Sequence, residues 1–464
     1  MSATVSTPAP HALLAPHALL PSGWARDVLL VWNDAGQLVR VAPNSSASTG
    51  VSTAAGNVIA GMPNLHSHAF QRAFAGLTEY RAGSNDSFWS WREHMYRFAA
   101  TLTPDAMEDI ATHAYIEMLR AGYTSVCEFH YLHHDRQGQP YADPAEMALR
   151  LIAAAQRAGI GLTLLPVLYQ ASGFGAQPPL PQQRRFVCSV EVLLAIVQRA
   201  SQFDARVGVA PHSLRAVPPA ALRELLSGMQ AIDAQAPVHI HIAEQQREVD
   251  DCVAWSGQRP LHWLLDDISV DARWCLVHAT HADTAELQWL ASSGATLGLC
   301  PSTEANLGDG VGRAAAYAEA GGSWGIGSDS HATVDPFEEL RWLEYAQRLA
   351  LQRRNVLASA ARPQVAQQLW LSAVAGGARA SGRPIGGLAV GQQADFLVLE
   401  PSASLQGLTP DQQLASRVFA SHGERAVREV WVGGRRRVAG GAHALADDAC
   451  RRFVAARAQL LCEG

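Results

Sequence analysis

From Gly61 to about Ala380 short apolar runs alternate with amphipathic stretches, and this alternation limits the fold more than any other feature. Eight apolar runs occur, ending near His66, Glu128, Tyr169, His212, Ala243, His278, Pro301 and Asp329. Most are separated by helical patterns, such as those at 104–121, 144–158, 218–234 and 335–353. Strands that alternate with helices form parallel βα units, and eight such units close into a barrel. The pattern predicts an α/β fold with a (β/α)8 TIM barrel over residues 61–381.

The two ends of the chain carry a different, purely β pattern. Short apolar runs separated by turn residues occupy Val28 to Trp32, Leu38 to Val41, Ala394 to Leu399 and Val427 to Val432. Neither end is large enough to be a domain alone, so we expect residues 18–60 and 382–464 to pack together as one small β-sandwich. Residues 1–17 hold the first of two PHALL copies among Ala, Pro, Ser and Thr, and are predicted to be a disordered extension.

The sequence contains no lysine, so all 36 basic side chains are arginine. A Schiff-base lysine, a phosphate-loop lysine and a carboxylated lysine that bridges two metals are therefore excluded. Any metal site must use other ligands.

Charge and composition limit the binding partners and the cellular compartment that we expect for this protein. The formal charge is −6 without a basic block, which argues against nucleic acid, and no stretch reaches the roughly 18 apolar residues of a membrane span. The seven cysteines are scattered and form no C-x-x-C pair, and the first 30 residues lack the basic and apolar regions of a secretory signal. We expect a cytoplasmic protein that acts on a small molecule.

Ionisable residues lie at four of the predicted strand ends. The first strand ends in His66-Ser67-His68, where a strand period of two points both imidazoles to one side. The fifth contains His239, His241 and Glu244, the sixth ends at His278, and the eighth ends at Asp329. An H-x-H pair alone is weak evidence for a metal, but buried ionisable groups on four strands are costly unless paired or metal-bound. Glu244 is placed to exchange a proton with a water at such a site.

With these residues the chain resembles the amidohydrolase superfamily, in its deaminase branch with a single divalent metal. The segment GGLAVGQQADFLVLE near the C-terminus is also similar to the superfamily. The resemblance implies one Zn²⁺ per chain, with Fe²⁺ also compatible, held by His66, His68, His241 and Asp329. It further implies that Glu244 transfers protons, that Asp329 also orients the water, and that His278 stabilises developing charge without ligating the metal.

Within that branch the resemblance is to the N-formimino-L-glutamate deiminases of histidine degradation. It is carried by PNLHSHAFQRAFAGLTEYR, FWSWREHMY, EFHYLHHD and VGVAPHSLRAV. It implies hydrolysis of formimino-glutamate to N-formyl-L-glutamate and ammonia. Its two carboxylates would be bound by Arg215 with His212 and by Arg92 with Tyr131, with the order left open, and Gln71 would contact the formimino group. Relatives imply a homodimer.

Simpler interpretations of these residues stay open. His278 could be a hydrogen-bonded core histidine, Arg92 a surface arginine on a Trp-rich segment, and Gln71 a loop residue satisfied by backbone. The segment 76–100 is longer than a usual βα loop, and such loops tend to be functional. The histidines of the HYLHHD cluster are expected at the pocket mouth.

Alternative activities also stay open. A ring deaminase acting on guanine, cytosine or a triazine would share the metal ligands, but a flat neutral base needs amide and stacking partners in place of two arginines. An imidazolonepropionase would open a ring without releasing ammonia. A non-catalytic barrel scaffold is disfavoured because all four ligands and Glu244 are present.

Overall fold

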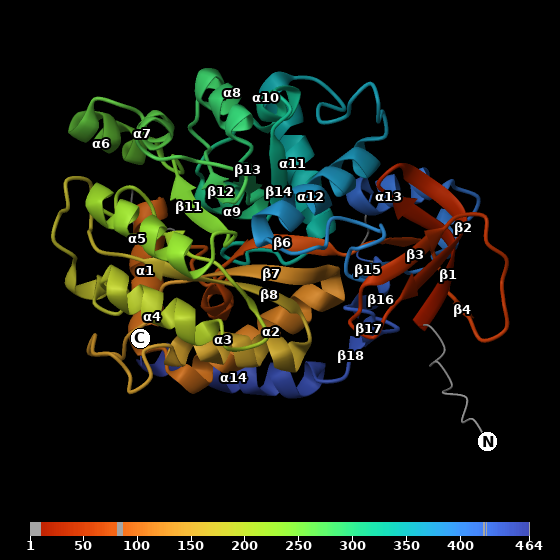
Figure 1. The fold of residues 1–464 in the computed structure, drawn as a ribbon, viewed down its shortest axis with the longest axis horizontal. Helices are drawn as coiled ribbons and strands as arrows, with labels where there is room; N and C mark the ends of the chain where they lie inside the picture. The colour runs from red at the N-terminus through yellow and green to blue at the C-terminus, as the bar shows by residue number, and fades with distance from the viewer. Residues whose placement is uncertain (1–10, 81–86, 421–422, 424, 464) are drawn as a thin grey trace.

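The computed structural model describes residues 11–80, 87–420, 423 and 425–463. At its centre lie parallel strands at the positions of the predicted apolar runs (Figure 1). They are β6 (Met62–Ser67), β7 (Tyr123–His130), β8 (Gly161–Leu168), β9 (Arg206–Val207) with β10 (Ala210–Pro211), β11 (Val238–Ile242), β12 (Trp274–His278), β13 (Thr296–Leu299) and β14 (Ser323–Ile326). The short β9 and β10 together take the fourth position of the barrel, because both pair with β8.

Isolated bridges close this ring. The strands from β6 to β10 form one sheet and β11 to β14 another, and the bridges Val209↔Val238 and Ser67↔Asp329 join the two sheets at both edges. At the second junction the amide of Asp329 donates to the carbonyl of His66 over 3.0 Å. A side chain at Gly327 would lie 2.8 Å from the His66 backbone, so only glycine permits this approach. The predicted TIM barrel is confirmed.

Helices cover the strands as expected for βα units. Those of the barrel region are η1 (Ala69–Ala73), α1 (Phe88–Thr101), α2 (Pro104–Ala121), α3 (Glu146–Ala158), η2 (Pro181–Gln183), α4 (Val190–Ala200), α5 (Pro219–Ile232), α6 (Gln246–Ser256), α7 (Pro260–Asp267), α8 (Thr284–Ser293), α9 (Pro301–Leu307), α10 (Ala314–Glu319), α11 (Pro336–Leu351) and α12 (Val365–Ser381). The four predicted helices correspond to α2, α3, α5 and α11. For α2 the predicted caps are present: the Thr103 side chain accepts from the Ala106 amide, and Gly122 ends the helix at φ 117°.

The segment 76–100 is not simply a long loop. Most of its second half forms α1, which begins at the Ser87 cap and carries Trp89, Trp91 and Arg92. The residues 81–86 of this segment lie outside the described part of the chain.

Strands from both ends of the chain form a second, nine-stranded sheet beside the barrel (Figure 1, right). It contains β1 (His11–Leu20), β2 (Gly23–Trp32), β3 (Leu38–Ala42), β4 (Ser52–Thr53) and β5 (Val58–Ala60), with β15 (Phe396–Leu399), β16 (Val427–Val432), β17 (Arg435–Ala439) and β18 (Ala442–His443). The two ends meet where β5 pairs antiparallel with β15. The predicted association of the ends is present as one sheet; that it folds into the two layers of a sandwich stays a prediction.

Two predicted boundaries at the chain ends are wrong. Residues 11–17, assigned to a disordered extension, form most of β1, because their apolar side chains Leu13, Leu14 and Ala15 are buried against β2. Residues 1–10 of that predicted extension lie outside the described residues. At the other end, the segment assigned wholly to the β domain also contains η3 (Ala403–Leu405), α13 (Pro410–Phe419) and α14 (Ala446–Glu463).

Helix α14 belongs with the barrel, where it packs on α2. Phe453 stacks on His113 with ring centres 4.3 Å apart, and Arg452 lies 3.7 Å from Asp109. No helix among the described residues combines the length and apolarity needed to cross a bilayer.

Candidate metal centre and active site

Three histidines and one aspartate converge at the carboxyl ends of the barrel strands. The Nε2 atom of His66 lies 3.2 Å from that of His68 and 2.9 Å from that of His241. The Oδ1 atom of Asp329 lies 3.4 Å from His66 Nε2 and 3.3 Å from His68 Nε2. Four ligand atoms at bonds of about 2.0–2.1 Å around a tetrahedral zinc ion would lie roughly 3.3 Å apart. The spacing therefore fits one small divalent cation, and the predicted ligand set is brought together.

The protonation of the histidines also fits a cation. The Nδ1 atoms of His68 and His241 lie 3.0 and 3.1 Å from the carbonyls of Phe129 and His212, to which they can only donate. Each Nε2 is then left with a lone pair. Burial lowers the pKa of His68 to about 3 and lowers the pKa of His66 and His241, so all three rings are neutral. Lone pairs that face one another need a cation between them, as metal ligation requires.

The backbone is strained where these strands end. His278 and Asp329 have φ values of 71° and 46°, and Ala243, next to Glu244, has 49°. Each value lies in the left-handed region that non-glycine residues rarely adopt, at a cost of about 1–3 kcal/mol. Such positions cluster at functional sites because the surrounding structure holds them there.

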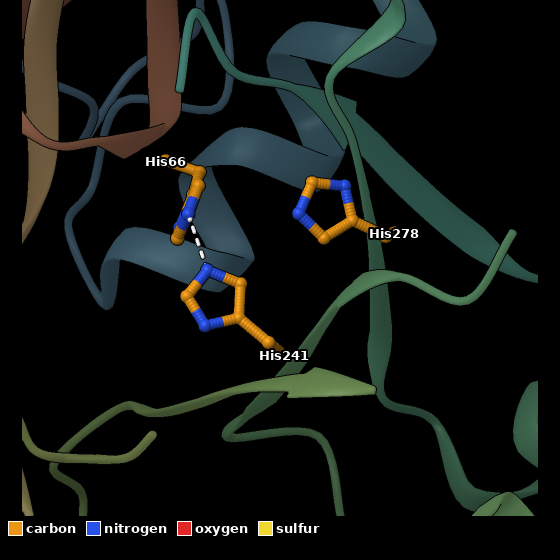
Figure 2. A group of neighbouring side chains, drawn as sticks. All are labelled: His66, His241 and His278. Carbon is orange, nitrogen blue, oxygen red and sulfur yellow. Dashed lines mark hydrogen bonds between the residues drawn. The ribbon is translucent and has the colours of Figure 1, made fainter. Parts of the chain in front are cut away.

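His278 lies beside His66 and His241 (Figure 2). Carboxylates lie on both sides of its ring. Its Nδ1 is 3.3 Å from Glu304 Oε1, and its Nε2 is 3.7 Å from Asp329 Oδ2 and 3.8 Å from Glu244 Oε1. One of its ring nitrogens lies within 4.8 Å of a ring nitrogen of His66 and of His241. Burial lowers the pKa of His278, but Glu244, Glu304 and Asp329 overcome this effect and raise it to about 10. A protonated imidazole cannot ligate a metal, which agrees with the predicted role outside the ligand set.

Glu244 is a buried carboxyl group with a cation on each side. Its Oε2 lies 3.8 Å from Nη2 of Arg215, while Oε1 faces His278. Burial raises the pKa of Glu244 to about 7, and His278 and Arg215 oppose the rise. A carboxyl group with this pKa can both accept and return a proton at neutral pH.

A pocket of about 590 Å³ opens in front of the metal-ligating group. Every predicted site residue except the more deeply buried His66 lines it: Gln71, Arg92, Tyr131, His212, Arg215, Glu244, His278 and Asp329, with His68 and His241. Arg92 reaches the pocket from α1, a helix between β6 and β7, and not from a strand end. The structure thus brings the two predicted arginines into the cavity that contains the metal-ligating group.

The simpler interpretations of Arg92 and Gln71 can now be weighed against the structure. Arg92 is not a fully solvated surface arginine, because its Nε is buried without a hydrogen-bond partner among the described residues. Gln71 is buried and its Nε2 donates to the Tyr131 hydroxyl over 3.0 Å, not to the backbone. His239, by contrast, donates from Nε2 to the Ala380 carbonyl over 2.8 Å and is a core histidine.

The expectation for the HYLHHD cluster is wrong for its histidines. Of the cluster only Tyr131 lines the pocket. His133 and His134 bond the carbonyls of Val167 and Val187 through Nε2, at 2.8 and 2.9 Å, and His130 packs against His133. These three imidazoles stabilise the loop that follows β7.

Comparisons with known proteins identify the family of the chain. The sequence profile of the amidohydrolase family matches residues 57–437. The chain belongs to this family. It is 52% identical to the formimidoylglutamate deiminase of Pseudomonas aeruginosa over 97% of this chain and 99% of the relative. The crystal structure of an amidohydrolase from Brucella melitensis, 48% identical, superposes with a TM-score of 0.93 over 97% of this chain and 100% of that one.

A more distant structural neighbour is the zinc-bound adenosine deaminase of Xanthomonas campestris. It is 24% identical and superposes with a TM-score of 0.77 over 96% of this chain and 98% of the other. At this identity the likeness extends to the fold alone.

Several residues of this amidohydrolase pocket were missed in the sequence. Tyr96 and Tyr169 line it, and Gln183 holds both of their hydroxyls. A signal existed for the tyrosines, because Tyr96 is one helical turn after Arg92 and Tyr169 stands at a strand end. Gln183 lies in a proline-rich loop, and nothing in its neighbourhood marks it.

A buried carboxyl group behind the ligands was also missed. Glu128 on β7 accepts from the Ser67 hydroxyl over 2.6 Å and from the Ala69 amide over 2.7 Å. It therefore holds the residues on both sides of His68, Ser67 through its hydroxyl and Ala69 through its backbone amide. Burial raises the pKa of Glu128 to about 7.

Proposed function

We propose that this amidohydrolase is a deiminase that hydrolyses N-formimino-L-glutamate to N-formyl-L-glutamate and ammonia. The observation that carries the proposal is the single pocket in which a metal-ligating group meets two arginines, the half-buried Arg92 and the buried Arg215. A substrate with an amidine carbon and two carboxylates matches both parts. The near full-length similarity to a formimidoylglutamate deiminase supports it.

The ligand set favours one Zn²⁺ per chain, held by His66, His68, His241 and Asp329. Three neutral imidazoles and one carboxylate are typical of zinc, and Fe²⁺ accepts the same ligands. When bound, the ion supplies a Lewis acid that lowers the pKa of a water molecule to about 7.

Glu244 moves the protons of the reaction. The water oxygen forms a bond to the formimino carbon, and the bond from that carbon to the terminal nitrogen breaks. Both water protons end on the departing nitrogen, which leaves as ammonia. Glu244, with its pKa near 7, is suited to take a proton from the water and return it to this nitrogen. Asp329 accepts a hydrogen bond from the water and fixes its direction of attack.

His278 and Gln71 act on the reacting group. The protonated His278, held by Glu304, stabilises the charge that develops as the formimino carbon becomes tetrahedral. Gln71 keeps its Oε1 unpartnered among the described residues, so this buried oxygen is available to a formimino N–H.

The carboxylates of the substrate bind the basic side of the pocket. We assign one to Arg215 with His212 and the other to Arg92 with Tyr131, and the Nε atoms of both arginines lack hydrogen-bond partners among the described residues. Guanidinium binds carboxylate through two parallel, charge-assisted hydrogen bonds. A neutral purine or pyrimidine carries no negative charge to balance two arginines. This favours the dicarboxylate over the ring-deaminase alternative.

An ammonia-release screen of formimino-amino acids against purines, with metal analysis of the same sample, tests the proposal. We expect ammonia from formimino-glutamate and about one metal ion per chain. Arg215→Ala should lose turnover and keep the metal, because its guanidinium contacts no ligand. Ammonia from purines alone would overturn the assignment.

We also propose that the chain is a cytoplasmic homodimer, as its resemblance implies. Light scattering of the purified protein tests the dimer.

A further inference from the structure

One buried glutamine holds the hydroxyls of two tyrosines in the pocket. Gln183, at the end of η2, is 0% exposed, and its Nε2 lies 2.8 Å from the hydroxyl of Tyr169 and 3.1 Å from that of Tyr96. Both tyrosines line the cavity that contains Arg92 and Arg215. The arrangement joins α1, the loop after β8 and η2 at a single side chain.

The direction of these hydrogen bonds is fixed by the backbone. The Leu180 amide donates to Oε1 of Gln183 over 2.8 Å, which identifies the oxygen end of the side-chain amide. The other end is an NH₂ group, which can only donate. Both phenol oxygens therefore accept from Gln183, and their own protons must find other acceptors. The hydroxyls of Tyr96 and Tyr169 can also bond each other. Such a bond uses one of the two phenol protons, so at least the other proton is available in the pocket.

Two arginines lie near the same tyrosines, and the neutral ring of His212 packs beside them. The guanidinium carbon of Arg92 lies 5.5 Å from the centre of the Tyr96 ring, and His212 packs on Tyr169 at 4.8 Å between ring centres. Burial raises the pKa of Tyr169, and the charges of Arg215 and Arg92 only partly oppose it. Tyr169 thus stays a donor at neutral pH. Hydroxyl donors between two guanidinium groups match an anion with several acceptor oxygens.

We propose that Tyr96 and Tyr169, oriented as donors by Gln183, bind one carboxylate of the substrate and set the preference of the pocket for a dicarboxylate. This rests on the proposed deiminase function. Gln183 is a positioning residue, because it acts on the substrate through the two tyrosines. Its amide nitrogen decides which way both hydroxyls point.

Reversing the hydrogen bonds tests the role of Gln183. In Gln183→Glu the side chain keeps its acceptor for the Leu180 amide but must accept from both tyrosines, so their lone pairs face the pocket. Hydrogen bonds to charged groups contribute about 1.5–3 kcal/mol, so KM for formimino-glutamate should rise roughly 10-fold or more, while kcat changes far less. Tyr169→Phe and Tyr96→Phe, which remove one donor each, should raise KM in the same sense.

Matched controls separate this effect from a loss of structure. Gln347→Glu makes the same change at a buried glutamine of α11 that bonds the backbone of Ala315 and Gly312, outside the pocket. Tyr317→Phe removes a buried hydroxyl that donates to the Ala295 carbonyl. Both should leave KM unchanged whatever they do to the melting temperature.

Substrates with one carboxylate locate the subsite. N-formimino-4-aminobutyrate lacks the α-carboxylate, and N-formimino-L-2-aminobutyrate lacks the side-chain carboxylate. The increase in KM caused by the tyrosine variants should persist with the substrate that keeps the carboxylate bound by the tyrosines. It should vanish with the substrate that lacks this carboxylate. An equal penalty with both, a loss confined to kcat, or no penalty in any of the three variants would overturn the proposal.

Binding measurements keep the test independent of turnover. The dissociation constant of N-formyl-L-glutamate, measured by calorimetry on the metal-loaded protein, should rise in the same three variants. A wild-type protein that releases no ammonia from formimino-glutamate would refute the proposed function. Unchanged binding of N-formyl-L-glutamate in the variants would refute the tyrosine subsite alone.

Discussion

The two sides of the pocket are built in different ways. The metal-ligating residues lie on or directly after barrel strands. The hydrogen-bonded register places Asp329 beside His66, and the closed barrel brings His241 across to them. The basic side is mixed: Arg215 and Tyr169 follow barrel strands, whereas Arg92 and Tyr96 come from α1 and Gln183 from η2. In this amidohydrolase the reaction chemistry is fixed by the barrel, while substrate recognition also depends on elements added between βα units.

The unpartnered buried atoms of the two sides differ in kind. On the metal side, the lone pairs of three neutral imidazoles meet one another and a carboxylate. On the basic side, the Nε donors of Arg92 and Arg215 lack hydrogen-bond partners among the described residues. Buried polar groups are nearly always satisfied, so the metal side needs a cation. On the basic side Arg215 already faces the carboxylates of Glu244 and Glu248 at 3.8 and 3.7 Å, but both Nε donors still lack a hydrogen-bond acceptor, which an anionic substrate would supply. Substitutions on the two sides should therefore fail in different measurements.

The largest effect is expected on the metal side. Asp329→Asn removes the one anionic ligand and leaves neutral groups facing a cation. We expect metal affinity to fall by more than the roughly 10–100-fold typical of residues behind the ligands, and ammonia release to be lost with it. Metal analysis after dialysis and the ammonia assay measure both. Full metal content in this variant would contradict the assigned ligand set.

Glu244→Gln should separate proton transfer from metal binding. We expect kcat to fall roughly 10²–10⁴-fold with metal content unchanged, because a general base is lost and no ligand is. The group is active when deprotonated, so kcat/KM of the wild type should fall as the pH drops through its pKa. Burial raises that pKa to about 7, and a bound cation lowers it, so the acidic limb should lie at or below pH 7. If kcat/KM of Glu244→Gln still falls at low pH as in the wild type, another group is responsible for that pH dependence.

The comparison also explains what could be predicted from the sequence. Strand ends are marked by apolar runs, so His66, His68, His241, His278 and Asp329 were found, and the barrel brings them together wherever they lie in the chain. The predicted helices matched α2, α3, α5 and α11 because they bury one apolar face and α2 carries clear caps. Arg92 was found through its resemblance, not through a pattern.

The features that could not be predicted from the sequence depend on tertiary contacts. Gln183 has no periodicity to mark it, since its importance comes from two tyrosines that lie 14 and 87 residues away in sequence. Residues 11–17 were mistaken for a disordered tail because their Ala and Pro content hid a strand that is stable only beside β2. Helix α14 was assigned to the β region because its partner α2 is distant in the chain.

Charge removal on the basic side should have an intermediate effect. Arg92→Met keeps the length and packing of the side chain and removes one carboxylate contact, so KM for formimino-glutamate should rise about 10–100-fold with metal content unchanged. Arg92→Lys should recover little of this loss, because an ammonium cannot form the paired hydrogen bonds. Steady-state kinetics with metal analysis tests both variants. Loss of metal in Arg92→Met would mean that the two sides are not separate.

The smallest effect concerns how α1 is held. Trp89 lies between two guanidinium groups, with Arg92 4.5 Å and Arg247 4.8 Å from its ring centre, and so connects α1 to α6. Each cation–π contact at such a site contributes about 0.5–1 kcal/mol, so Trp89→Leu should raise KM by about 2–5-fold through a less constrained Arg92. Arg247→Met, which breaks the α6 contact alone, should raise KM by no more than this. The matched control is Trp289→Leu, at an exposed tryptophan of α8 that packs beside His262. This variant should leave KM unchanged. If Trp89→Leu lowers kcat and leaves KM unchanged, α1 contributes to the chemical step, and the division between a catalytic barrel and an inserted recognition helix fails.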